Sequence, residues 1–238
     1  MFRRISLISL GLIFLVLFVY SSIQIVMPLR AYHTARTEYI QLRNDFGIPP
    51  MDAISLPEPF DDEYLVECDD FEQYLDELSQ KNVFFDILYN INSDVVFWLV
   101  LPGSNVSYPV VQGVDNELYL RRTFQGEQNA SGAIFLDYRN CANLTDVHTL
   151  IYGHNMLDGS MFAALHSWDG DHFIIFKPDE IIVYRVLDRQ TMSDNDALFF
   201  IPNDVWDNED SIVTLSTCVS GAPHLRYVVH GQRLSPPS

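Results

Sequence analysis

The stretch Ser211-Ile-Val-Thr-Leu-Ser-Thr-Cys218, followed by Val219-Ser-Gly-Ala-Pro-His-Leu-Arg226, decides how this 238-residue chain is interpreted. Its β-branched residues predict a strand that ends at Cys218, and the Ser-Gly-Ala-Pro segment predicts a turn before a second strand that carries Arg226. Because side chains alternate along a strand, Cys218 shares a face with Ser216. A thiol at a strand end beside an arginine is a candidate nucleophile, although free cysteines are more often small core residues.

Charge and cysteine content limit the possible classes of protein. The chain has 32 acidic against 14 basic residues and a formal net charge of −18, so no nucleic-acid partner is expected. A hydrophobic content of 48% is ample for the core of one good-sized domain. Three cysteines, Cys68, Cys141 and Cys218, are too few for a disulfide framework and leave at least one thiol free; pairing of the first two stays open.

The N-terminal segment predicts a membrane anchor. Residues 5–27 carry no charge and follow Arg3-Arg4, and about 20 apolar residues suffice to cross a bilayer. A cleavable signal peptide is the alternative, but its apolar core is normally about 7–15 residues and no A-x-A site follows. We therefore expect a single-pass anchor, with residues 1–4 in the cytoplasm. Arginines flank both sides of the apolar run, so their distribution does not determine the orientation of the anchor. The expectation that the main domain lies outside the cell is therefore inferred from the rest of the chain.

Residues 28–84 predict a polar connection between this anchor and the main domain. Residues 28–48 are expected to form a helical stalk, and the prolines of 48–62 predict a partly extended linker. A short amphipathic helix, capped by Asp69-Asp70 and running to Leu78, is expected to pack on the main domain.

The main domain, residues 85–238, is expected to be mostly β. From Ile91 onward, short β-rich runs alternate with Gly, Pro, Asn and Asp turns, which predicts a closed or nearly closed eight-stranded barrel. Short helices are expected at Asn116–Leu120 and Ser160–Leu165. The eight runs are 95–101, 106–111, 132–136, 148–152, 172–176, 181–186, 211–217 and 225–230.

His154 is the candidate partner for the thiol. It follows Gly153 at the end of another predicted strand, a location that mirrors that of Cys218. A cysteine with a pKa of about 8.5 is mostly protonated at neutral pH, so a nucleophilic thiol needs a base or imidazolium nearby. Arg226 could hold the oxygen of a tetrahedral intermediate, because a guanidinium stays charged.

Metal binding is the weaker hypothesis. His148 and His154 lie six residues apart, and Cys218, His224 and His230 repeat at the same interval, so a zinc site can be imagined. No C-x-x-C or H-E-x-x-H spacing occurs, and we expect neither a metal nor an organic cofactor. The remaining histidines look like stalk, loop or surface residues: His33, His166 and His172.

These motifs resemble those of sortases, the membrane-anchored cysteine transpeptidases of Gram-positive bacteria. The resemblance rests first on Thr214–Cys218, Tyr152–Met156 and Arg226. It extends in consistent order over about residues 85–234 and is closest to class B. The class B resemblance is carried by residues 91–99, 108–113, 115–116, 132–140 and 159–162.

The resemblance implies an eight-stranded sortase-type barrel with N-terminal helices, displayed outside the cell. Cys218 would attack a C-terminal sorting signal of a secreted protein and form a thioacyl enzyme, His154 would transfer protons, and Arg226 would stabilise the oxyanion. The acceptor would be an amino group of the peptidoglycan cross-bridge or lipid II. One alternative is a pilin-polymerising sortase that uses a lysine as acceptor. The other is a non-catalytic surface barrel that only binds peptides. The residues implied to line the signal-binding groove are Asn116, Leu120, Tyr152 and Ser216.

Two departures from class B stand out. Class B enzymes commonly carry a long helix before the catalytic strand, whereas only residues 187–210 are expected to connect the two strands here. Some class B members have an acidic residue two positions after the cysteine, where this chain has Ser220. The resemblance therefore leaves a fourth, acidic catalytic member in doubt.

Overall fold

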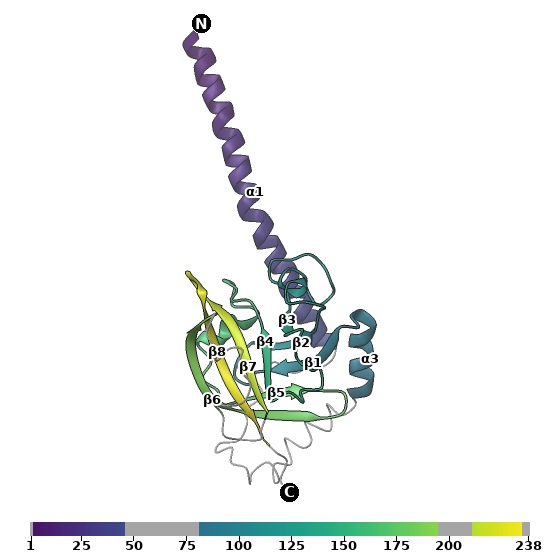
Figure 1. Ribbon diagram of the computed structural model, residues 1–238. Helices are drawn as coiled ribbons and strands as arrows, with labels where there is room; N and C mark the ends of the chain where they lie inside the picture. The colour runs from purple at the N-terminus through teal and green to yellow at the C-terminus, as the bar shows by residue number, and fades with distance from the viewer. Residues whose placement is uncertain (1, 46–80, 195–210, 235–238) are drawn as a thin grey trace.

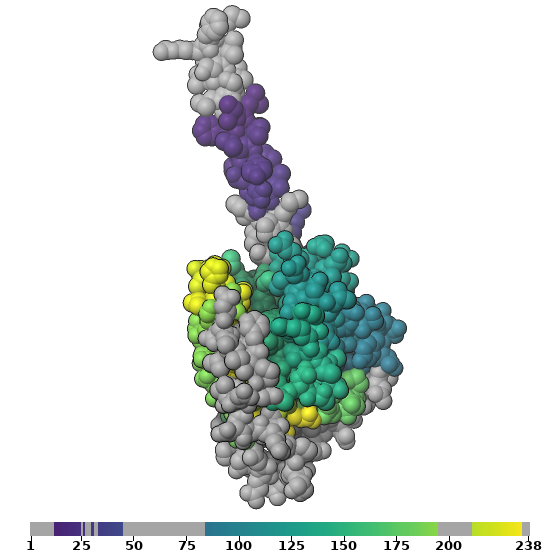
Figure 2. Space-filling view, in the orientation of Figure 1, coloured from purple at the N-terminus to yellow at the C-terminus, as the bar shows by residue number. Residues whose placement is uncertain are grey.

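A long helix and a β-barrel make up the computed structural model, which describes residues 2–45, 81–194 and 211–234. Helix α1 (Phe2–Asp45) is continuous and projects from one end of the barrel (Figure 1, Figure 2). The helix predicted for residues 28–48 is thus confirmed as far as Asp45, while the predicted linker and the helix ending at Leu78 lie outside the described residues. Within the described part of the chain, no helix meets the length and apolarity needed to cross a membrane.

The predicted eight-stranded barrel is confirmed. The strands close in the order β1-β2-β3-β4-β7-β8-β6-β5. Most neighbours are antiparallel, but β2 pairs with β3 and β4 pairs with β7 in parallel. The strands are β1 (Val95–Val100), β2 (Ser107–Val111), β3 (Ile134–Leu136), β4 (His148–Tyr152), β5 (His172–Phe176), β6 (Ile181–Ser193), β7 (Ile212–Val219) and β8 (Ala222–Arg233).

Strand β6 is longer than the sequence indicated. It was expected to end at Val186, but it continues to Ser193 after an irregularity in its pairing with β8 between Val186 and Asp188. Strand β8 also extends beyond its predicted bounds, so its backbone groups pair with those of β6 as far as Ser193. The connection to β7 therefore begins at Asp194, not at residue 187, and residues 195–210 lie outside the described part.

Helix α3 (Lys81–Ile91) packs against the barrel and was not predicted. Its Phe85 and Leu88 are fully buried, and the ring of Phe84 meets that of Trp98 at 5.4 Å. The two short connecting helices are confirmed as 3-10 turns at Leu118–Leu120 and Phe162–His166. His172, expected at the surface, is buried in β5.

Asp137, immediately after β3, ties three segments of the barrel together. Its carboxylate accepts two hydrogen bonds from the Arg139 side chain, both at 2.8 Å, one from Asn116 at 2.9 Å and one from the Tyr152 hydroxyl at 3.0 Å. Burial raises the pKa of Asp137, but the hydrogen bonds outweigh this and lower it to about 2. The loop before the 118–120 turn, β3 and β4 are thereby held in one arrangement.

We predict that Asp137→Asn lowers the free energy of unfolding by about 2–4 kcal/mol, because it removes the charge of a buried carboxylate that accepts hydrogen bonds from Arg139, Asn116 and Tyr152. The matched control is Asp179→Asn, whose carboxylate is exposed and lies 3.7 Å from Lys177; it should change stability by less than about 0.5 kcal/mol. The folded pKa of Asp137 lies below its ordinary value of 3.8, so its stabilisation is complete above that pH and is lost as pH falls through about 2. Urea unfolding of both variants between pH 2 and 7 measures this; equal curves for Asp137→Asn and wild type at pH 7 would contradict it.

Candidate active site

The position of β7 between β4 and β8 determines what surrounds Cys218. Parallel pairing with β4 sets Tyr152 opposite Ser216, and antiparallel pairing with β8 sets Arg226 opposite Cys218. Residues directly opposite in an antiparallel pair present their side chains on the same face, so the thiol and the guanidinium are neighbours. Cys218 is a free thiol and is partly exposed.

His154 stands just beyond the end of β4. The amide of Gly153 donates to the Ser216 carbonyl at 3.1 Å, which continues the parallel pairing past the strand end. A side chain at position 153 would meet Ile134 at 2.4 Å and Phe162 at 2.7 Å, so the chain passes here only as glycine. The ring Nε2 of His154 lies 2.8 Å from the Leu120 carbonyl oxygen.

The contact with Leu120 defines the tautomer of His154. A carbonyl oxygen can only accept, so Nε2 carries the hydrogen in this bond. In the neutral ring, Nδ1 is then the atom that accepts a proton. Any proton that His154 takes from or gives to a reacting group therefore moves at Nδ1.

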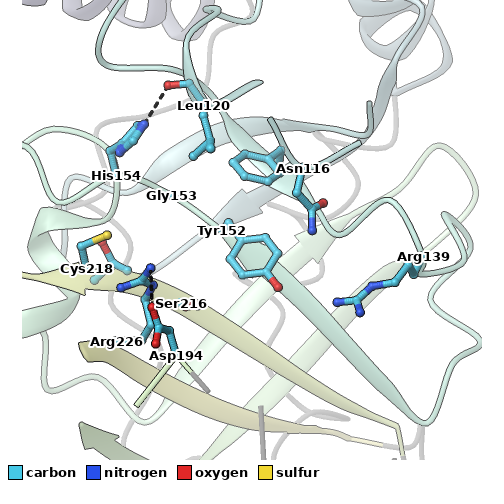
Figure 3. A pocket seen from close by; sticks show the side chains of 12 residues that line it. Asn116, Leu120, Arg139, Tyr152, Gly153, His154, Asp194, Ser216, Cys218 and Arg226 are labelled. Carbon is cyan, nitrogen blue, oxygen red and sulfur yellow. Dashed lines mark hydrogen bonds and ion pairs between the residues drawn. The ribbon is translucent and has the colours of Figure 1, made fainter. Parts of the chain in front are cut away.

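Arg226 is held from two sides. Its Nη1 donates to the carbonyls of Pro223 at 2.7 Å and Leu225 at 3.0 Å, and its Nη2 lies 3.5 Å from Oδ2 of Asp194. Figure 3 shows the guanidinium between Cys218 and Asp194. Asp194 was not predicted to lie here, because it belongs to a segment that was expected to be a connection between strands.

One groove of about 300 Å³ contains every residue that the sequence nominated. His154, Cys218 and Arg226 lie along it, and Figure 3 shows their side chains facing a common space. The four residues implied to bind a signal line it as well: Asn116, Leu120, Tyr152 and Ser216. Phe135 and Arg139, which were not nominated individually, complete one wall together with Tyr152.

Two hydroxyl groups give the groove its polar character. The Oγ of Ser216, a residue that lines the groove, is buried and has no hydrogen-bond partner among the described residues. The Tyr152 hydroxyl donates to Asp137, and burial together with that carboxylate raises the pKa of Tyr152 above its usual range. Tyr152 therefore remains a neutral part of the groove wall.

Asn155 and His166 hold the backbone at Cys218, a role that the sequence did not indicate. The Asn155 side-chain amide donates to the Cys218 carbonyl at 2.9 Å and contacts Oγ of Ser220 at 3.2 Å. His166 Nε2 lies 3.2 Å from the same carbonyl, and its ring packs on Tyr227 at 4.7 Å. The sequence indicated only a loop or surface position for His166. The fold of residues 155–166 brings it next to Cys218.

Two histidines of the zinc hypothesis form a different arrangement. His148 Nε2 and His230 Nδ1 each lie 2.7 Å from the Thr214 hydroxyl oxygen. Burial lowers the pKa of both rings, that of His148 to about 4, so both are neutral at neutral pH. Across the described parts of the chain, no three His, Cys, Asp or Glu residues are grouped so as to hold a metal ion.

Comparison with known proteins identifies the family. Residues 99–234 match the model of the sortase domain. Sortase B of Listeria monocytogenes is 42% identical over 91 residues, which are 38% of this chain and 37% of that relative. The matched stretch thus spans little more than a third of the curated relative.

Solved structures agree over a longer stretch. Clostridium perfringens sortase B has a TM-score of 0.57 and 27% identity, with coverage of 63% of this chain and 100% of that chain. A Streptococcus pyogenes class B sortase involved in pilus biogenesis has a TM-score of 0.58 and 32% identity, with coverage of 65% and 100%. Since the family model covers more than half of its 238 residues, the chain belongs to the sortase family, and the resemblance to class B sortases is confirmed.

Proposed function

We propose that this chain is a cysteine transpeptidase that cleaves a C-terminal sorting signal of secreted proteins and joins the new carboxyl end to a cell-wall amino group. The observation that carries this proposal is the placement of His154 and Cys218 at adjacent ends of two parallel strands, with Arg226 opposite the thiol. All three line one groove that is large enough for part of an extended peptide.

The reaction we propose has two steps. The Cys218 thiolate attacks a backbone carbonyl of the signal, the C–N bond breaks, and His154 gives the leaving amine a proton from Nδ1. This leaves a thioester between Cys218 and the shortened protein. The acceptor amine then loses a proton to His154 and attacks the thioester, which forms a new amide bond and returns the thiolate. The residues on the groove suffice for these steps without a cofactor.

Arg226 is proposed to stabilise the oxyanion that forms in each step. Its guanidinium lies beside the thiol, and its Nη2 lies 3.5 Å from Oδ2 of Asp194. A positive charge placed where negative charge develops lowers the barrier, because it needs little reorganisation at the moment of reaction. Asn116, Leu120, Tyr152 and Ser216 are proposed to bind the signal.

We further propose that residues 5–27 anchor the protein in the cell membrane, with the barrel outside the cell. Large apolar side chains between Leu12 and Val26 of α1 are exposed, which is unfavourable in water but suits a bilayer. The tip of the β7–β8 hairpin lies at the end of the barrel from which α1 leaves (Figure 1). This arrangement would keep Cys218 near the membrane surface, where secreted proteins and lipid-linked wall precursors are found.

A second candidate function is the joining of pilin subunits, since one of the structurally similar class B sortases is involved in pilus biogenesis. The two functions differ in the acceptor, a lysine side chain of a pilin or an amine of the peptidoglycan cross-bridge or lipid II. Mass spectrometry of products formed from one sorting peptide and competing amines distinguishes them. A barrel that binds peptides without cleaving them would give no product with either amine.

We predict that Cys218→Ala abolishes cleavage and transfer of any sorting peptide that the wild type cleaves, because no thioester can form. The matched control is Cys141→Ala, which removes the other described free cysteine, an exposed one, and should leave turnover unchanged. Peptide cleavage is followed by chromatography, and the thioacyl enzyme by intact-protein mass spectrometry. Normal turnover by Cys218→Ala would refute the proposed mechanism.

We predict that Arg226→Ala lowers kcat by roughly 10²–10³-fold, the scale of a lost oxyanion contact. Arg226→Lys should lose less, because it keeps the charge but not the planar fork. Arg36→Ala, on the exposed part of α1, serves as the control for loss of one positive charge. Steady-state kinetics on a cleavable peptide decide: a change confined to KM would show that Arg226 only binds the substrate.

A further inference from the structure

The stalk helix reaches the loop that holds His154 through one buried side chain, Tyr39. Its hydroxyl accepts a hydrogen bond from the Phe124 amide at 3.1 Å and donates one to the Gly132 carbonyl at 3.2 Å. The side chain is 2% exposed, and burial raises the pKa of Tyr39 well above its ordinary value, so the hydroxyl stays protonated. Helix α1 thus fixes two points of the loop that runs from Leu120 to Gly132.

Gly132 transmits this contact to the active site. It has a positive φ of +59°, and a Cβ placed on it would lie 2.9 Å from the Leu120 carbonyl oxygen and 3.1 Å from Cδ2 of His154. Gly132 therefore packs directly against the histidine ring and against the acceptor of its Nε2–H group. A displacement of Gly132 would move both.

A second link runs from the Tyr39 ring to the backbone of His154. The ring meets that of Tyr108 edge-on, with centroids 5.0 Å apart, and the Tyr108 hydroxyl accepts a hydrogen bond from the Met161 amide at 3.2 Å. Met161 has a φ of +55°, which is rare for a residue other than glycine and needs support from its surroundings. The next amide, that of Phe162, donates to the His154 carbonyl at 3.0 Å.

We propose that Tyr39 is a positioning residue for transpeptidation, which holds the Leu120 carbonyl and Gly132 so that His154 keeps its Nε2–H tautomer and presents Nδ1 to the reacting groups. The stalk is then part of the catalytic scaffold as well as a tether. Without the Tyr39 hydroxyl, the loop loses two buried hydrogen bonds and the Nε2–H group loses a fixed acceptor. The neutral ring then also populates the Nδ1–H tautomer, which cannot accept a proton at Nδ1. The kinetic part of this inference rests on the proposed function.

The first test is kinetic and compares Tyr39→Phe with wild type in the full-length chain in detergent micelles. We expect kcat for sorting-peptide cleavage to fall about 10-fold, because a misplaced His154 loses part of the contribution of general acid–base catalysis. We expect KM to change by less than about 2-fold. Tyr89→Phe is the matched control, because Tyr89 lies partly exposed on α3; it should behave as wild type. A kcat for folded Tyr39→Phe equal to that of wild type overturns the proposal.

The second test needs no substrate, so it separates failure of this inference from failure of the proposed function. In protein labelled with ¹⁵N-histidine and followed in a pH series, the signals of the neutral His154 ring, assigned with His154→Gln, should report the Nε2–H tautomer in wild type and Tyr89→Phe. In Tyr39→Phe they should move toward the Nδ1–H tautomer. A fall in kcat without this movement means that Tyr39 acts only on general stability, and it also overturns the proposal.

Tyr108→Phe provides an independent variant if Tyr39→Phe does not fold, as judged by circular dichroism. It removes the acceptor of the Met161 amide and leaves both hydroxyl contacts of Tyr39 in place. We expect a smaller fall in kcat and movement of the His154 signals in the same direction. Wild-type kinetics and wild-type His154 signals in Tyr108→Phe would refute the link from the stalk to His154.

Discussion

The parallel pairing of β4 with β7 is the constraint on which the rest of the site depends. Parallel neighbours point their carboxyl ends to the same edge of the sheet, so residues that follow the two strands meet there. The register that sets Tyr152 opposite Ser216 brings His154 to the same end as Cys218, although 64 residues separate them in sequence. Shifting this register by one residue would turn Ser216 and Cys218 to the other face of the sheet.

The groove contains two arginines whose ion pairs differ in kind. Arg139 makes two hydrogen bonds of 2.8 Å to Asp137, whose side chain is almost completely buried. The Arg139 side chain is half exposed, but removing it would leave the buried Asp137 charge without its bidentate partner, so Arg139 belongs to the framework of the site. Arg226 lies 3.5 Å from Asp194, and both side chains are about one quarter exposed. Because Asp194, unlike Asp137, is partly solvated, the Arg226 guanidinium can turn toward a developing oxyanion without leaving a buried charge unpaired.

Local patterns in the sequence were enough to predict the barrel and the two strand ends that carry His154 and Cys218, whereas the groove residues were implied by the family resemblance. Alternating β-branched residues and turn signals act over a few residues, and the family resemblance supplied how the strands come together. Helix α3 was missed because its buried residues, Phe85 and Leu88, were not recognised as one apolar face. Asn155 and His166 were missed for a different reason: their contacts with the Cys218 carbonyl depend on tertiary folding, which periodicity cannot reveal.

Both departures from class B seen in the sequence lie close to the active-site groove. The Ser220 hydroxyl, where some class B members carry an acidic group, is in contact with the Asn155 amide. The carboxylate beside Arg226 comes instead from Asp194, which follows β6 and whose amide donates to the His224 carbonyl at 3.0 Å. Asp194 reaches that place because β6 continues along β8 to Ser193. The same strand extension that shortens the connection to β7 therefore supplies an acidic neighbour for Arg226 from the opposite side of β8.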